Sequence, residues 1–200
     1  SVYGNNQSLS ANGSGVAAQA AVAASGATAG FNGVTSGTVT INGSIGSASG
    51  TVAASGSAQT TAAMINGLRD STGVTATART EVQVDVGAAS GSFSLTLKSQ
   101  NTTAETVSFT LAAGSGSDRL SVAVSAINDK SAKTGITASL SQDGKSMILT
   151  NDSGADITVG TAKNVANADV VSLTKLQADG TAAGASQTLA LASTATGMTS

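Results

Sequence analysis

The sequence predicts an α+β fold that is mostly β, made of two β-β-α-β-β units with antiparallel sheets and one short helix each. The first observation behind this prediction is an internal repeat: residues 65–76 and 127–138 align without a gap and share an Ile-Asn start and a Thr-Gly near the end. Such self-similarity indicates one supersecondary unit used twice. The second is that Val, Ile and Leu alternate with Ser and Thr in short runs, which is typical of half-buried strands. The third is a helical spacing of apolar residues before and into each copy of the repeat.

The composition limits the partners that the chain can have. Its 200 residues suffice for one domain or two small ones, and charged residues make up only 10% of them, with a net charge of −2. Scattered Lys and Arg leave no electrostatic footprint for nucleic acid, and no apolar run approaches the roughly 18 residues that cross a bilayer. The start of the sequence also lacks the basic-then-apolar pattern of a cleaved signal. We therefore expect neither nucleic acid nor a membrane as a partner.

The missing residue types limit the chemistry. The chain has no Cys, His, Trp or Pro. Without Cys there are no disulfides or thiolates, and without His the commonest general base and metal ligand is lost. We therefore expect no enzyme, no catalytic residue, no cofactor and no metal site. A Ser-Lys hydrolase is kept as a third hypothesis, although no Gly-x-Ser-x-Gly follows a hydrophobic strand and opens a helix.

Residues 1–36 and 37–90 are predicted to form a lead-in and the first unit. The lead-in is rich in Gly, Ser, Ala and Asn, so we expect an irregular or linker strand, with a strand near Val2-Tyr3. The first unit begins with a strand at 38–41, a type I′ turn at Asn42-Gly43 and a second strand near 51–54.

A short helix is expected next in the first unit. Ser55 is its candidate N-cap and Gly73 its C-terminal stop. After it, alternation at 74–78 and 82–86 predicts two strands or one long bent strand. The buried stripe of the helix is predicted from spacings of four and three: Ala58, Ala62 and Ile65.

Residues 91–160 are predicted to repeat this plan. Strands at 93–97 and 107–111 should form a hairpin, Ser117 is the candidate N-cap, and Gly135 should end the helix. The matching stripe consists of Leu120, Val124 and Ile127. A hairpin through Asp143-Gly144, a turn at 151–154 and a short strand at 157–159 are expected to complete the unit. Residues 161–200 should hold a returning strand, near 170–176, and an Ala/Ser/Thr-rich tail.

Two kinds of loop resemble ion sites, and both have a simpler explanation. Residues 114–117 could offer backbone N–H groups to an anion, but they lack the Walker lysine and the Rossmann glycine spacing. Residues 143–145 and 152–156 lack the alternating acidic ligands of a calcium loop, and turn-forming Asp explains them. Three isolated acidic residues are expected to be solvated or to lie at helix ends: Asp70, Asp118 and Glu105.

Glycosylation signals are weak in this sequence. In a chain so rich in Ser and Thr, N-x-Ser/Thr sequons arise close to chance, and composition alone chooses no site for O-linked sugar. The sequons begin at Asn6, Asn12, Asn42, Asn101 and Asn151.

The repeated motif resembles a known family. Ile65-Asn66 and Ile127-Asn128, each followed by Thr-Gly-Val/Ile-Thr-Ala, resemble the IN repeat of bacterial flagellins and hook-associated proteins. The stretch from Thr134 to Thr150 and the overall composition resemble the central variable region of Pseudomonas-type flagellins. The resemblance covers about residues 37–160. It implies flagellin outer domains, and because the sequence has no long heptad helices, we expect a central fragment that holds only those domains.

The resemblance implies a structural role. The chain would form the surface-exposed part of the bacterial flagellar filament, extracellular, supporting motility and setting the surface properties of the filament. The implied partners are other flagellin subunits, with surface glycans, host receptors and antibodies as further candidates. Members of the family are often O-glycosylated, but no site carries over to a residue here. In this interpretation the Asn after each Ile is a polar residue at a helix end.

Two alternative functions stay open. One is an extracellular adhesin-like or glycan-binding module, and the other is a domain of a hook-associated or cap protein. A glycan site needs a polar aromatic groove, yet the chain has only Tyr3 and three Phe, and Phe93 and Phe109 occupy core positions of predicted strands.

Overall fold

The computed structural model describes residues 22–25, 32–88, 90–114, 116–161, 171–189 and 196–199. The predicted strand near Val2-Tyr3 lies outside the described residues. The described chain is mostly β, with antiparallel sheets and a few short helices, so the predicted fold class is confirmed. The unit boundaries at 36/37, 90/91 and 160/161 stay predictions.

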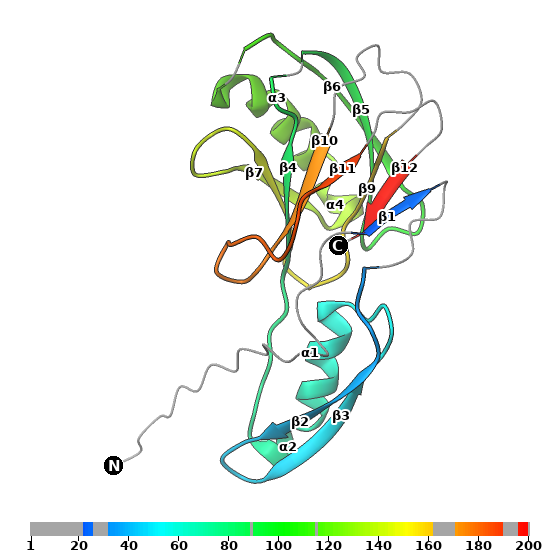
Figure 1. The fold of residues 1–200 in the computed structure, drawn as a ribbon, viewed down its shortest axis with the longest axis vertical. Coiled ribbons are helices and arrows are strands. Elements are labelled where there is room, and N and C mark those ends of the chain that lie inside the picture. Colours follow the sequence, from blue (N-terminus) through cyan, green and yellow to red (C-terminus); the bar gives the residue numbers. More distant parts are fainter. Residues whose placement is uncertain are drawn as a thin grey trace.

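The larger body consists of two five-stranded sheets (Figure 1). The first sheet has the order β1 (Val22–Ser25), β12 (Thr196–Thr199), β9 (Thr158–Thr161), β5 (Gly91–Lys98) and β6 (Glu105–Leu111). The second has the order β11 (Gln187–Leu189), β10 (Val171–Leu176), β4 (Thr80–Asp85), β8 (Met147–Asn151) and β7 (Thr137–Leu140). All neighbours are antiparallel, and the predicted hairpin of β5 and β6 and the returning strand β10 are both present.

The core of the larger body lies between the two sheets and under helix α3 (Ser117–Asn128). Phe93 and Phe109 stack at the centre of the β5–β6 hairpin, with ring centroids 5.6 Å apart. Helix α3 contacts β6 and β7, the end strands of the two sheets, so it closes one end of the sandwich. Its buried residues are Leu120, Ala123 and Ile127, whereas Val124 of the predicted stripe is half-buried.

The smaller body is a two-stranded hairpin covered by two short helices. It consists of β2 (Gly37–Asn42), β3 (Ser47–Val52), α1 (Ala58–Gly67) and α2 (Arg69–Thr72). Ile41, Val52 and Ala62 are buried, but Ala58 is exposed and Ile65 only half-buried. The predicted stripe on this helix is therefore wrong at Ala58. The reason is that α1 covers only a narrow hairpin, whereas α3 covers the end of a sandwich.

The first hairpin turn differs from its prediction. The loop runs from Gly43 to Gly46, because Asn42 pairs with Ser47, and it is closed by Gly43 N–H donating to Gly46 O over 2.9 Å. A two-residue type I′ turn at Asn42-Gly43 is thus wrong. A Cβ at Gly43 would lie 1.8 Å from the carbonyl oxygen of Thr72, so glycine is needed here for close backbone packing.

The two predicted N-caps are also wrong. Ser55 has a φ of 55° in the turn before α1, and the cap is Ser57, whose Oγ accepts from Thr60 N–H over 3.2 Å. Ser117 is the first residue of α3, and its cap is Gly116. Both errors are one or two residues in size, where several Ser and Gly residues compete for the same position.

Residues 74–79 connect the two bodies and lead directly into β4 (Figure 1). Val74, Ala76 and Ala78 are half-buried, whereas Thr75 and Thr77 are exposed, so the predicted alternation is present. Of the stretches predicted as two strands or one long bent strand, 82–86 overlaps β4, whereas 74–78 belongs to no described strand.

A buried polar cluster holds the smaller body against the larger. Asn32 is buried, and its Nδ2 donates to Gly56 O (3.0 Å) and to both carboxylate oxygens of Asp156 (3.1 and 3.2 Å). Burial raises the pKa of Asp156 and lowers the pKa of nearby Lys175. A backbone bond from Gln59 N–H to Gly154 O adds a second link.

Among the described helices, none has the length and apolarity to cross a membrane.

Candidate functional site

The asparagine of each motif copy binds both backbone groups of the residue ten positions further on. Asn128 Nδ2 donates to Ala138 O over 3.0 Å, and Ala138 N–H donates to Asn128 Oδ1 over 2.7 Å. Asn66 makes the same pair of bonds with Ala76, at 2.9 and 2.8 Å. One side-chain amide thus imitates a neighbouring β-strand. The asparagine lies at the end of its helix as expected, but it also aligns the chain that follows.

The Thr-Gly pair of each copy ends the helical segment in one shared way. The hydroxyl of Thr134 donates to Lys130 O and accepts from Ile136 N–H, and Thr72 makes the corresponding bonds. Gly73 and Gly135 follow with φ values of 74° and 71°. These left-handed residues end α2 and α4 (Ser131–Thr134), so both predicted helix stops are confirmed. Both threonines are fully buried, which explains why a small hydroxyl residue precedes each glycine.

Each helix end is also tied to the preceding hairpin. The carbonyl of Thr134 accepts from Gln100 N–H over 3.1 Å, and that of Thr72 accepts from Ile45 N–H over 3.5 Å. The two copies therefore share three kinds of polar contact: the asparagine pair, the threonine cap and the hairpin tie. These contacts give the repeated residues an architectural role.

Asn151 strengthens this arrangement in the second copy. Its Nδ2 donates to Gly135 O (3.1 Å) and Ser99 Oγ (3.0 Å), and its Oδ1 accepts from Ser153 N–H (2.9 Å). Because it is fully buried, Asn151 is no acceptor for an N-linked sugar in the folded chain. Asn101 is half-buried and bonded to Leu97 O, and Asn42 is exposed. The sequons at Asn6 and Asn12 lie outside the described residues.

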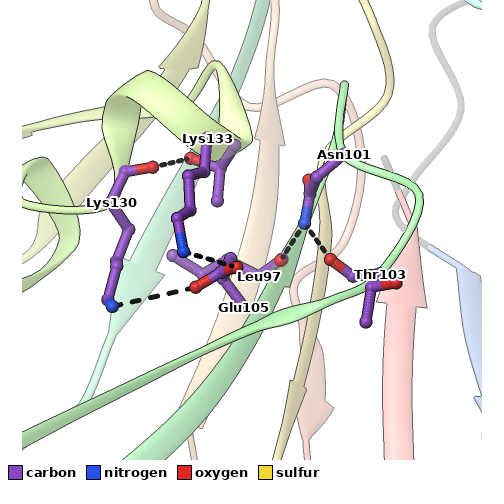
Figure 2. A network of polar contacts seen from close by, with 7 residues as sticks. Leu97, Asn101, Thr103, Glu105, Lys130 and Lys133 are labelled. Atoms are coloured by element: carbon purple, nitrogen blue, oxygen red, sulfur yellow. Dashed lines mark hydrogen bonds and ion pairs between the residues drawn. The ribbon is translucent and has the colours of Figure 1, made fainter.

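Glu105 joins the start of β6 to α4 and to the residue before it, Lys130 (Figure 2). Its carboxylate lies 3.7 Å from Lys130 Nζ and 3.4 Å from Lys133 Nζ. The expectation of a solvated or helix-terminal charge is wrong for Glu105, since the two lysines come from the distant repeat segment. Figure 2 also shows Asn101 donating to the carbonyls of Leu97 and Thr103, which shapes the hairpin loop beside the ion cluster.

The loops that resemble ion sites in the sequence are turns and a helix start in the structure. Gly116 caps α3, which begins at Ser117, and Gly116 lines a pocket together with Arg119 and Lys145. Asp143 accepts from Ser141 Oγ (2.6 Å) and Lys145 N–H (3.1 Å), and these bonds lower the pKa of its carboxyl. Within the described ranges no group of three or more acidic side chains gathers to hold a metal ion.

The described aromatic side chains lie in the core. Phe93 and Phe109 are buried and stacked on each other, while Tyr3 and Phe31 lie outside the described residues. The described surface therefore presents no aromatic platform of the kind that a glycan groove requires.

Comparison with known proteins gives one family match. Residues 92–153 match the family described as the flagellin hook IN motif, and no curated protein matches the chain. The matched segment is about a third of the chain. It runs from β5 to the turn after β8 and includes Asn128, Thr134, Gly135 and Asn151, whose contacts are described above. The match supports a flagellin-like structural component of the flagellum, an extracellular appendage, with flagellin subunits as partners. In sequence, the segment from β5 to β8 is thus similar to the flagellin hook IN motif.

Proposed function

We propose that this chain is the surface-exposed outer-domain region of a Pseudomonas-type flagellin and carries two IN repeats. The observation that carries the proposal is the flagellin IN match at 92–153, whose key polar contacts recur between residues 45 and 76. In this role the chain decorates the filament, supports motility and sets the chemistry of the filament surface.

The outward faces of both hairpins suit contact with water. Cross-strand hydroxyl pairs line them, such as Thr40 with Ser49 (3.0 Å) and Ser94 with Ser108 (3.3 Å). Among the described residues, the large apolar side chains that are exposed are Ile45 and Val122. A hydroxyl-rich surface with few exposed apolar side chains offers little area for non-specific hydrophobic association.

Cysteine labelling of assembled filaments tests this proposal. The 200 residues contain no Cys, so Val122→Cys adds the one reactive thiol of this region, and the full-length gene product without the substitution is the labelling blank. Val122 is 50% exposed and its neighbour Ala123 is 0% exposed, which makes Ala123→Cys a matched control. We expect a maleimide dye to label Val122→Cys along intact filaments and to leave Ala123→Cys unlabelled. If Val122→Cys is labelled in the isolated chain but not in assembled filaments, the proposal that this region lies on the filament surface is wrong.

A hook-associated protein is the second candidate, because the matched family carries the hook in its description. The same labelled variant separates the two functions. Dye along the whole filament supports the flagellin, whereas dye confined to the hook–filament junction or to the filament tip supports a hook-associated or cap protein.

A further inference from the structure

We propose that residues 74–78 form an open strand edge that accepts one extended strand from a different protein, in antiparallel pairing. The second copy of the motif shows how such an edge is filled. There, β7 lies between Asn128 on one side and β8 on the other, with Thr137 opposite Thr150 and Ser139 opposite Ile148.

The direction of the backbone groups follows from these contacts. The N–H and C=O of one strand residue point to the same side, and those of its neighbours point to the opposite side. Because Ala138 uses both groups on Asn128, Thr137 and Ser139 must direct theirs toward β8. The bond from Ser141 N–H to Ser146 O (2.9 Å) continues this alternation beyond the strand.

The first copy has the same alternation, but no described strand lies on its outer side. Ala76 uses both backbone groups on Asn66, so Thr75 and Thr77 direct theirs away from α1. No described strand pairs with this segment, and no described residue bonds to the backbone of Thr75 or Thr77. The side chains of both threonines are exposed, so solvent reaches the edge.

The chemistry of the incoming strand can be inferred from β8. In β8, Met147 and Leu149 are buried and Ile148 and Thr150 are half-buried. In the first copy, Ala76 and Ala78 correspond to Ala138 and Leu140, which pair with Leu149 and Met147 of β8. Both alanines are small and half-buried. A strand with small or apolar side chains at alternate positions, and polar ones between them, fits this edge. Main-chain bonds supply the affinity in such strand addition, and alternate side chains supply the specificity.

A peptide with the sequence of residues 145–152 is the direct probe, because it contains the strand that fills the equivalent edge. We expect it to bind the 200-residue chain with a Kd of about 0.1–1 mM, as expected for a few backbone hydrogen bonds. Amide chemical shifts of Thr75 and Thr77 should change on titration, and those of Thr137 and Ser139 should not. No shift change at Thr75 and Thr77 with 5 mM peptide would overturn the proposal; that concentration is roughly five times the weakest expected Kd.

Variants locate the interaction in the backbone. Thr77→Pro removes one edge N–H and should weaken binding at least about tenfold, while Thr77→Ala keeps that N–H and should bind as the wild type does. A proline favours extended backbone at the residue before it, so Ala76 should keep its bonds to Asn66 in Thr77→Pro. An unfolding temperature of Thr77→Pro equal to that of the wild type checks this. Equal binding by Thr77→Pro would overturn the proposal. So would self-association of the chain alone that Thr77→Pro abolishes, because the edge would then belong to a second copy.

Discussion

Replacing Asn128 by alanine measures what the repeated asparagine contributes. The change leaves the N–H and C=O of Ala138 without their partner, and Ala138 is only 8% exposed. A buried polar group without a partner costs about 1–3 kcal/mol, so two of them should lower the free energy of unfolding by about 2–6 kcal/mol. Asn66 and Ala76 are less buried, and water can replace the lost bonds there. Asn66→Ala should therefore cost about 0.5–1 kcal/mol.

Urea unfolding followed by far-UV circular dichroism checks both values. Ser125→Ala on the exposed side of α3 is the matched control, and a surface change of this kind should stay within about 0.5 kcal/mol of the wild type. If Asn128→Ala costs no more than this control, or if Asn66→Ala costs as much as Asn128→Ala, the asparagine bonds do not stabilise the fold as stated.

Three further predictions concern glycine packing, pH and salt. Gly43→Ala should cost more than about 2 kcal/mol in thermal unfolding, because its Cβ would overlap the carbonyl of Thr72, whereas Gly67→Ala, with open space around it, should stabilise by up to about 1 kcal/mol. Burial raises the pKa of Asp156 above 3.8, so ionising this carboxyl costs more in the folded chain than in the unfolded chain. In urea titrations, the wild type should therefore lose stability relative to Asp156→Asn as the pH rises from 4 to 7. A wild type that gains stability relative to Asp156→Asn over this range would contradict the prediction. Glu105→Gln should cost less than about 1 kcal/mol, and the cost should shrink in high salt because both ion pairs are partly exposed; a cost that salt leaves unchanged would argue against charge pairing.

Local patterns allowed several elements to be predicted. Alternation of Phe and Leu with Ser and Thr predicts the β5–β6 hairpin, since one face of that strand pair is buried and the other is solvated. Gly73 and Gly135 were predictable as helix stops because only glycine enters the left-handed region at little cost. The repeat itself predicts that both copies share a helix end.

Features that depend on contacts between residues far apart in the chain could not be predicted from the sequence. Whether Ala58 is buried depends on what α1 packs against, and a narrow hairpin covers less of a helix than a sandwich does. The glycine at position 43 is required by the carbonyl of Thr72, which periodicity does not reveal. Asn32 and Asn151 look like ordinary turn residues in the sequence, yet each is buried and satisfied by partners far along the chain. For the repeated asparagines a signal did exist, because a polar residue at the same place in both copies indicates a shared contact.

Amide hydrogen exchange of the two motif copies shows directly whether each asparagine acts as a substitute strand. In the second copy, Thr137, Ala138 and Ser139 should all exchange slowly, since Asn128 lies on one side of β7 and β8 on the other. In the first copy, the amide of Ala76 should be protected by Asn66, while those of Thr75 and Thr77 exchange rapidly. Protection of Ala76 no greater than that of Thr75 and Thr77 would contradict the account.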